Sequence, residues 1–274
     1  MFCKFLLYTN TVLFLFLPFC AETFAGDVSV ELETLYWFGS TDRDEVKYTL
    51  HNFGGGSVKM QKELGVSSDK STPVVKLALN LSADSRLRFT AWSLERDGEG
   101  VVDRRVGFDD SVFVHGTTVL SQFRYFTLRA EYDYDIAHYE NKWLKDLYVT
   151  SGLEYVSLFG SVTDAAIGQD DKMDSGSLAP LLGFGIDGEI TENLKYRFAF
   201  SGIAYKWDST KNTNHFHQVV SNFILGLKYE SGRFGFSTGY EYFSFVVGNE
   251  MDPDQEREFH VFNGGPFVGF SINF

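Results

Sequence analysis

Residues 266–274, at the end of the chain, read PFVGFSINF and predict a β-strand with two unlike faces. Successive side chains of a strand point to opposite sides, so every second residue shares a face. One face then carries only apolar side chains, namely Pro266, Val268, Phe270, Ile272 and Phe274. The other face carries Phe267 among glycine, serine and asparagine. We therefore expect a strand with one wholly apolar face and one mostly small or polar face, closing on an aromatic residue.

The same alternation is clearest inside the chain at residues 126–136, which read FTLRAEYDYDI. Every second residue from Phe126 to Ile136 is apolar, and the residues between them include Arg129, Glu131 and Asp133. Charges at this density would be very costly in a dry core. Alternation alone is also compatible with a soluble sandwich of two sheets, but the buried charges favour a barrel with a polar lumen.

Ten segments alternate in this way, and their connections alternate in length. We expect strands at residues 27–38, 74–82, 86–96, 126–136, 147–159, 178–190, 194–207, 215–230, 234–247 and 258–274. The expected long loops are 39–73, 98–116, 160–177, 208–214 and 248–257, and the expected turns are 83–85, 137–146, 191–193 and 231–233. Long external loops, short periplasmic turns and an even strand number are typical of transmembrane barrels. The sequence thus predicts an all-β, antiparallel, up-and-down transmembrane β-barrel of ten strands, with eight or twelve as alternatives.

Aromatic residues gather at the ends of the expected strands. Tyr36, Trp37 and Phe38 lie at an expected external end, and Tyr134 and Phe274 lie at expected periplasmic ends. Aromatic rings form girdles where a barrel wall meets the lipid headgroups. We therefore expect these rings to mark the two membrane surfaces.

The start of the chain predicts export. A basic residue, Lys4, precedes an apolar run of about 15 residues, and the small residues Thr23 and Ala25 follow it at the spacing of a cleavage site. We expect residues 1–25 to be a cleaved signal peptide and residues 26–274 to form the barrel. The run is too short for a good membrane-spanning helix.

Composition excludes several classes of function. The two cysteines, Cys3 and Cys20, lie in the expected signal peptide, so we expect neither disulfides nor thiolate metal sites in the barrel. A lipoprotein that is acylated at Cys20 is disfavoured because Phe19, a large residue, precedes it. The formal net charge of −13 argues against a nucleic-acid partner, which needs a basic surface. No nucleotide or phosphate motif is present, and we expect no cofactor and no metal.

Charged residues on the inward faces predict a network in the lumen. Ten strands enclose an interior only modestly wider than that of eight, which side chains just fill. Because acidic and basic residues are nearly balanced on these faces, we expect them to pair and to plug most of the lumen. The predicted network comprises Glu31, Glu33, Arg86, Arg88, Arg129, Glu131, Asp133, Asp187, Arg197 and Glu241.

The chain after residue 25 resembles small, porin-like outer-membrane β-barrel proteins of Gram-negative bacteria. Residues 268–274, VGFSINF, resemble the last strand of such barrels, and residues 30–38, VELETLYWF, look like their first strand. The resemblance implies an integral protein of the outer membrane that contacts lipid and lipopolysaccharide. It also implies that the barrel-assembly machinery reads Phe270, Ile272 and Phe274. It leaves activity and oligomeric state open.

Barrel enzymes are the alternative class. Omptin-type proteases share the ten-strand count and use Asp pairs with an Asp/His pair at the external rim. The nearest features here are Asp109 and Asp110 with His115, and His215 or His217 in another part of the rim. Lipid A deacylases of the barrel type use Ser, His and an acid, for which Ser221 lies near His215 and His217.

No motif fixes either catalytic arrangement. The pair His215 and His217 also lacks a clear third metal ligand, and the loop acids Asp164, Asp170, Asp171 and Asp174 do not have the spacing of an EF-hand. A structural or surface-interaction role is therefore the first hypothesis, with a narrow channel for small solutes second and a rim-active hydrolase third.

Overall fold

The computed structural model describes residues 28–40, 44–50, 54–108, 111–141, 143–208, 215–252 and 255–274. The predicted signal peptide, residues 1–25, lies outside this part of the chain, as do Asp109 and Asp110. No helix among the described residues is long and apolar enough to cross a membrane.

Nearly all of the described chain is β-strand. The strands are β1 (Ser29–Ser40), β2 (Glu45–Leu50), β3 (Gly54–Lys59), β4 (Asp69–Asn80), β5 (Ser85–Val101), β6 (Val106–Phe108), β7 (Ser111–Phe113), β8 (Thr118–His138), β9 (Asp146–Asp164), β10 (Asp170–Thr191), β11 (Leu194–Asp208), β12 (His215–Ser231), β13 (Phe234–Asp252) and β14 (Gln255–Asn273). A short helix, α2 (Met60–Glu63), follows β3.

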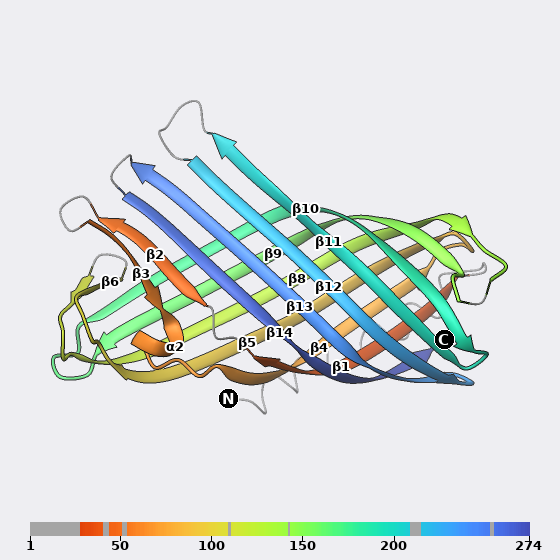
Figure 1. Cartoon of the computed structure of the whole chain (residues 1–274), viewed down its shortest axis with the longest axis horizontal. Helices are drawn as coiled ribbons and strands as arrows, with labels where there is room; N and C mark the ends of the chain where they lie inside the picture. Colours follow the sequence, from red (N-terminus) through yellow and green to blue (C-terminus); the bar gives the residue numbers. More distant parts are fainter. Residues whose placement is uncertain are drawn as a thin grey trace.

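Ten of the described strands close into an antiparallel barrel. Their order is β1, β4, β5, β8, β9, β10, β11, β12, β13 and β14, and β14 pairs back onto β1. The closing register sets Leu32 opposite Ile272 and Trp37 opposite Phe267. The long, tilted strands are seen in Figure 1. This confirms the predicted all-β, up-and-down barrel of ten strands.

The short connections lie at one end of the barrel, together with the C-terminus (Figure 1). These connections are residues 81–84, 139–145, 192–193 and 232–233. The amide of Phe274 donates to the carbonyl of Val30 (2.8 Å), which places the end of β14 beside the start of β1. Because periplasmic turns of outer-membrane barrels are short, this is the periplasmic end and the opposite end is external.

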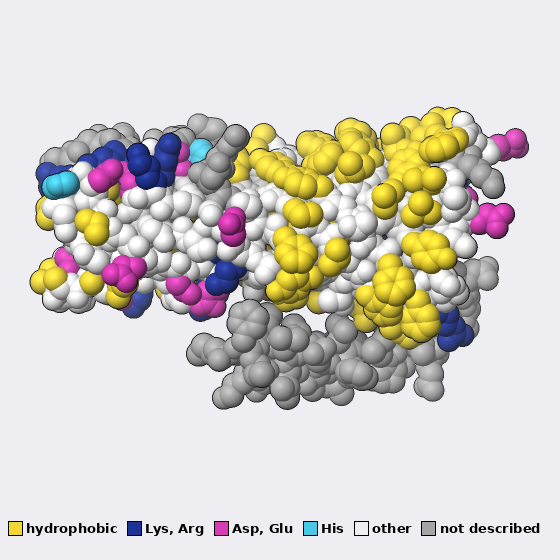
Figure 2. Space-filling view, turned by 60° about the horizontal axis from the view of Figure 1, so that its bottom comes forward, with side chains coloured by type: hydrophobic (Ala, Val, Ile, Leu, Met, Phe, Trp, Pro, Cys, Tyr) yellow, Lys and Arg dark blue, Asp and Glu magenta, His cyan; other side chains and the backbone are white. Residues whose placement is uncertain are grey.

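Apolar side chains are concentrated on the outer surface of the periplasmic half. Figure 2 shows them gathered over that half, whereas charged side chains and histidine are scattered over the other. On β8, outward apolar residues run from Phe126 to Ile136. At about 3.3 Å per residue and a tilt of about 40°, this run spans about 25 Å of membrane thickness. The barrel therefore crosses the membrane with its periplasmic half and projects beyond the membrane with its external half.

The two faces of β8 exchange character at the membrane surface. From Thr127 to Asp133 the inward residues are polar or charged, and the outward ones are apolar. Above Phe126 the outward residues include Gln122 and Arg124, and the inward ones are mostly apolar, including Phe123 and Tyr125. In the part of β8 that is surrounded by lipid, the interior of the barrel is therefore polar. In the part that is surrounded by water, the interior is apolar.

This exchange explains why several predicted loops are wrong. β9 continues to Asp164 and β10 begins at Asp170, so most of the predicted loop 160–177 is strand. β13 and β14 likewise continue through most of the predicted loop 248–257. Because the apolar residues change from one face to the other at the membrane surface, a period-two reading ends there although the strand does not.

The predicted loop 39–73 is also structured. β2 pairs with the external part of β14 and with β3, so this hairpin continues the barrel wall beyond the end of β1. The predicted loop 98–116 contains the end of β5 and the separate hairpin β6–β7. Of the predicted aromatic girdle, Tyr36 (46% exposed) and Phe38 (47%) face outward, but Trp37 (2%) faces inward.

Candidate functional site

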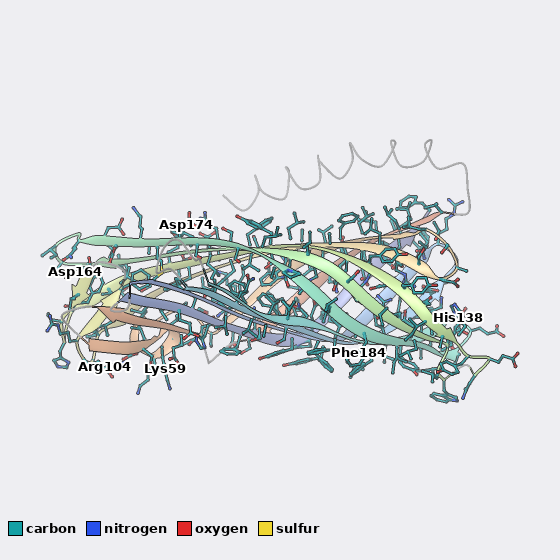
Figure 3. All side chains as sticks on the ribbon, turned by 90° about the horizontal axis from the view of Figure 1, so that it is seen from above. Lys59, Arg104, His138, Asp164, Asp174 and Phe184 are labelled. Carbon is teal, nitrogen blue, oxygen red and sulfur yellow. The ribbon has the colours of Figure 1, made fainter. Side chains whose placement is uncertain are left out.

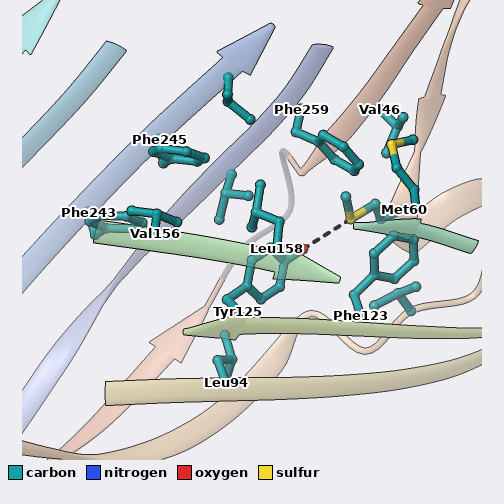
Figure 4. Close-up of a cluster of buried hydrophobic side chains, with 14 of the residues drawn as sticks. Val46, Met60, Leu94, Phe123, Tyr125, Val156, Leu158, Phe243, Phe245 and Phe259 are labelled. Atoms are coloured by element: carbon teal, nitrogen blue, oxygen red, sulfur yellow. Dashed lines mark hydrogen bonds between the residues drawn. The ribbon is translucent and has the colours of Figure 1, made fainter. Parts of the chain in front are cut away.

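The interior of the external half is a packed apolar core. Three rings from three strands meet edge to face: Trp37 lies 5.4 Å from Trp92, and Trp92 lies 5.3 Å from Phe243, measured between ring centroids. Figure 4 shows further members of this cluster. The buried apolar side chains here include Leu35, Val46, Val58, Met60, Leu64, Val74, Leu94, Phe108, Phe123, Tyr125, Val156, Leu158, Phe245, Phe259 and Val261. An interior filled in this way is that of a soluble domain.

Two insertions complete this core from inside the barrel and from its external end. Met60 of α2 is fully buried, and the hydroxyl of Tyr125 donates to its sulfur (3.3 Å; Figure 4). Phe108 of the β6–β7 hairpin packs edge to face on Phe123, with ring centroids 6.1 Å apart. Gly160 makes room for these rings, since a Cβ there would lie 2.9 Å from Phe123 and 3.2 Å from Phe108.

Ion pairs fasten the insertions at the external end. Asp44 and Arg96 are fully buried and pair at 2.9 Å, and Asp44 also accepts the amide of Phe262. Arg104 binds the carboxylate of Glu63 at 2.5 Å, near Lys59 at the external end (Figure 3). Burial raises the pKa of Glu63, but the guanidinium of Arg104 and the amide of Lys59 outweigh it and hold this pKa below its ordinary value. Glu63 is thus held as a carboxylate.

The interior of the membrane-spanning half is polar, and the predicted network residues meet there. Lys228 of β12 binds Glu31 of β1 at 2.5 Å, and Lys76 of β4 binds Glu241 of β13 at 3.2 Å. Neither pair joins strands that are neighbours in the barrel, so both contacts cross the lumen. Glu33 accepts from the hydroxyl of Ser237, at 2.6 Å.

A second group of these contacts centres on two aspartates. Arg88 binds Asp133 at 2.6 Å, and Arg197 binds Asp187 in a bidentate pair at 2.8 and 2.9 Å. Arg86 also lies 3.5 Å from Asp187, which joins β5 to β10 across the lumen. Planar guanidinium groups suit carboxylates in this geometry.

The two halves of the interior meet at a layer of buried polar groups. Arg129 binds Glu154 at 3.0 Å and Asn222 at 2.5 Å, and all three side chains are almost fully buried. Glu131 accepts from Ser201 at 3.2 Å, and Ser177 hydrogen-bonds Gln218. The contacts of Arg129 with Asn222, Glu131 with Ser201 and Ser177 with Gln218 again join strands that are not neighbours.

A cavity of about 460 Å³ lies in the polar half, among these charged side chains. Its lining includes Glu31, Arg86, Asp187, Arg197 and Lys228. The cations of this lining are engaged with carboxylates, so the cavity is mixed in charge and has no excess of free cations. It can hold water and small polar solutes.

The periplasmic rim carries one histidine between two carboxylates. His138 lies 2.7 Å from Asp146 through Nδ1 and 2.8 Å from Asp84 through Nε2, at the end opposite Arg104 in Figure 3. These hydrogen bonds, to Asp146 first and then to Asp84, raise the pKa of His138. Donor atoms of Asp135, His138 and Asp146 lie within 4.8 Å of one another, but both imidazole nitrogens are already bound to carboxylates. The cluster therefore ties β8 to β9 and to the β4–β5 turn through hydrogen bonds of His138 to two carboxylates.

The catalytic candidates are only partly described. His115 is exposed, and its Nδ1 lies 2.7 Å from the carbonyl oxygen of Asp103. Asp109 and Asp110 lie outside the described residues, as do the side chains of His215 and His217. Ser221 pairs with Gly202 on β11 and with Ser244 on β13, within the barrel wall. The apolar core of the external half was not foreseen, although its inward residues lie at alternate positions.

No protein-family model and no curated protein matches the chain. Among solved structures, the outer-membrane protease OmpT of Escherichia coli aligns with 92% of this chain and 98% of its own, with 9% identity and a TM-score of 0.51. The translocator domain of the autotransporter NalP from Neisseria meningitidis aligns with 92% of this chain and 90% of its own, with 12% identity and a TM-score of 0.41. Ail of Yersinia pestis has a TM-score of 0.37 at 9% identity, over 89% of this chain and 99% of its own. The likeness to OmpT shows the fold alone, which is that of an outer-membrane β-barrel.

Proposed function

We propose that the protein is a sealed, non-enzymatic barrel of the outer membrane, with a structural or surface-interaction role exerted by its external half. The observation that carries this proposal is the packed apolar core inside that half. Ions and polar solutes cannot cross such a core without losing their hydration, which is costly. The external half then resembles a small soluble domain held at the cell surface by its transmembrane base.

Contacts across the lumen support the same function. The pairs Lys228–Glu31, Lys76–Glu241 and Arg129–Asn222 join strands on different sides of the barrel. A conducting pore would need these pairs to separate, and each separation would leave charges without partners. A narrow channel, the first alternative, is therefore not favoured.

A rim-active hydrolase, the second alternative, has no assembled site to support it. OmpT is a protease, but at 9% identity that activity does not extend to this chain. His115 is bound to a backbone carbonyl, and the remaining candidates lie outside the described residues or in the barrel wall.

The surroundings proposed for the barrel are lipid and lipopolysaccharide around its apolar band. Phe270 and Phe274 are exposed on the outer surface of the last strand. Together with Ile272 they fit the proposed recognition by the barrel-assembly machinery during biogenesis. No nucleic acid is expected as a partner, given the net charge of −13.

Conductance in planar lipid bilayers tests this function. We expect the purified, refolded protein to insert without producing stepwise currents in salt of about 1 M. A matched variant in which Phe123, Tyr125 and Phe243 are all replaced by serine should show currents if it remains folded, because the apolar barrier is then removed. Stable, stepwise currents from the unaltered protein would overturn the proposal.

A further inference from the structure

The barrel wall divides between β10 and β11 in the external half. These strands pair from Thr191 and Leu194 up to Leu182 and Gly202, and their pairing ends there. β10 continues on β9 to Asp170, and β11 continues on β12 to Asp208. Figure 1 shows the two arms diverging. The division therefore starts within the lipid-facing band, and most of it lies above the membrane.

The direction of the backbone bonds shows which groups face the gap. In an antiparallel strand the N–H and C=O of one residue point to the same side, and successive residues alternate. The amide of Asp164 on β9 donates to the carbonyl of Gln169, just before β10, so odd residues of β10 bond β9. The even residues, including Leu178 and Gly176, therefore direct their backbone groups toward the gap.

Pro180 fits this arrangement and explains where the gap begins. It is an even residue of β10, so the N–H that proline lacks would have pointed at β11. Within sheets, proline is confined to edges and to positions where no ladder bond is needed. β10 can thus keep its full pairing with β9 while it cannot bond β11 at this position.

A similar division on the other side of the barrel is covered by the chain itself. β4 and β5 pair only up to Val74 and Trp92, yet β5 continues to Val101. An extended segment lies along this free part of β5, with Val66 bridged to Gly98 and the amide of Ser67 donating to the carbonyl of Asp97. This molecule therefore already contains one strand edge that is covered by an extended peptide.

The gap exposes the backbone edge of β10, but it does not open into the lumen. Behind it, Ala179 and Leu181 are fully buried, and Ser177 hydrogen-bonds Gln218 of β12. Outward residues of the free edge are acidic on balance. Lys172 pairs with Asp170 at 2.5 Å, and Asp174 has no ion pair with any other described residue. Asp164 and Asp174 lie on the same arm (Figure 3).

We propose that the external edge of β10, residues 170–178, binds an extended, basic segment of a partner protein by adding it as a strand. This inference rests on the proposed function, because it places the surface interaction on the external half. Main-chain hydrogen bonds supply the affinity in such strand addition, and side chains on alternate positions supply the choice of partner. The acidic residues of the edge favour lysine and arginine on the outward positions of the added strand.

A second copy of the chain does not fit this edge. Two barrels in one membrane are related by an axis along the membrane normal, so strands tilted by about 40° would cross at about 80°. Such strands cannot form a ladder. Lipid acyl chains fit only the lowest part of the gap, because they offer no hydrogen bonds to the N–H and C=O groups above it.

The test uses the full-length protein in detergent micelles and a fluorescent peptide of about eight alternating lysine and valine residues. We expect saturable binding by fluorescence anisotropy. The variant Gly176→Pro removes one N–H that faces the gap and should weaken binding about ten-fold. The matched control Gly176→Ala keeps that N–H, and its Cβ would meet only the hydroxyl end of Tyr155, at 3.0 Å, so it should bind as the unaltered protein does.

Charge is tested separately with the pair Asp170→Asn and Asp174→Asn. We expect this double variant to bind the lysine peptide several-fold more weakly at low salt, and the difference to fade at about 0.5 M salt. Heat-modifiability on gels shows whether each variant is folded. Absent binding, or equal binding by folded Gly176→Pro and Gly176→Ala proteins, overturns the inference. Conductance is measured on the same samples, so a conducting barrel that binds the peptide would overturn only the proposed function.

Discussion

Arg129 is the residue on which the middle of the lumen depends most. It is 2% exposed and binds Glu154, which is fully buried, together with Asn222 on the opposite wall. A buried ion pair adds little net stability when both charges are present. The loss of one partner is strongly destabilising, because it leaves the other charge buried without compensation. The pair therefore fixes the arrangement of the lumen more than it adds to the free energy of unfolding.

Replacing Arg129 alone should accordingly be costly. We expect Arg129→Leu to lower the free energy of unfolding by about 3–5 kcal/mol, since Glu154 would keep a buried charge without its cation. The double variant Arg129→Leu with Glu154→Leu should recover most of that loss. The measurement is urea unfolding of protein refolded into lipid vesicles. A single variant as stable as the unaltered protein would show that the pair is not buried as described.

His138 gives the periplasmic rim a dependence on pH. Hydrogen bonds to Asp146 and Asp84 raise the pKa of His138 above its ordinary value of about 6.5. A histidine whose pKa is raised by folding stabilises the protein fully at a pH below its pKa in the unfolded chain. That stabilisation is lost as the pH rises through its pKa in the folded protein. We expect His138→Gln, which keeps a side-chain donor but no charge, to be less stable than the unaltered protein at pH 5.5. The difference in urea midpoint should vanish by about pH 9, whereas a difference that grows with pH would contradict this role.

The β6–β7 hairpin is the element that covers the external end. Phe108 fixes it to Phe123 within the apolar core, whereas Val114, just after the hairpin, is 60% exposed. The exposed basic residues Arg104 and Arg105 lie just before it. Opening of this hairpin therefore presents a site for trypsin while the rest of the barrel stays closed.

Truncation of Phe108 should loosen this hairpin. A buried Phe→Ala change costs about 3–5 kcal/mol, so cleavage that follows local opening should accelerate at least about ten-fold in Phe108→Ala. The measurement is limited trypsin digestion of intact cells, followed on gels. Val114→Ala serves as the control and should be cut at the rate of the unaltered protein. Equal rates for both variants would mean that the hairpin is not anchored through Phe108.

The strands show how far the sequence alone could go. The alternation at residues 126–136 predicted β8 and its inward charges, because lipid and a polar lumen impose opposite demands on the two faces. The eight residues from Thr118 to Tyr125 were missed, since Phe123 and Tyr125 are apolar at odd positions whereas Phe126 and Leu128 are apolar at even ones. The prediction places Trp37 in the girdle because it is an aromatic residue at a strand end, whereas its side chain faces inward.

The sequence could likewise predict one part of the candidate site and not another. The alternating pattern could identify which charges face inward, such as Glu31 and Glu241. It could not identify their partners, because Lys228 is 197 residues from Glu31 along the chain and reaches it only through the register of the closed barrel. The core around α2 escaped prediction because a short helix inside a polar stretch has no periodicity to detect.

At the scale of the whole molecule, the protein combines two kinds of solvation in one set of strands. In the periplasmic half lipid surrounds a charged interior, and in the external half water surrounds an apolar one. The central claim is that a long strand such as β8 exchanges its two faces at the membrane surface. Under the proposed function, this arrangement seals the barrel and sets a domain-like body above the membrane.

Single cysteines along β8, examined with a membrane-impermeant maleimide on intact cells, test that claim most directly. The two native cysteines, Cys3 and Cys20, both precede the described residues and can be replaced. We predict rapid labelling of Gln122→Cys and Arg124→Cys, which face water, and none of Leu128→Cys and Tyr132→Cys, which face lipid. The inward positions Phe123 and Arg129 should stay unlabelled as cysteines because the interior is sealed. Labelling of both inward positions at the rate of Gln122→Cys would instead reveal an open, water-filled lumen and contradict the account.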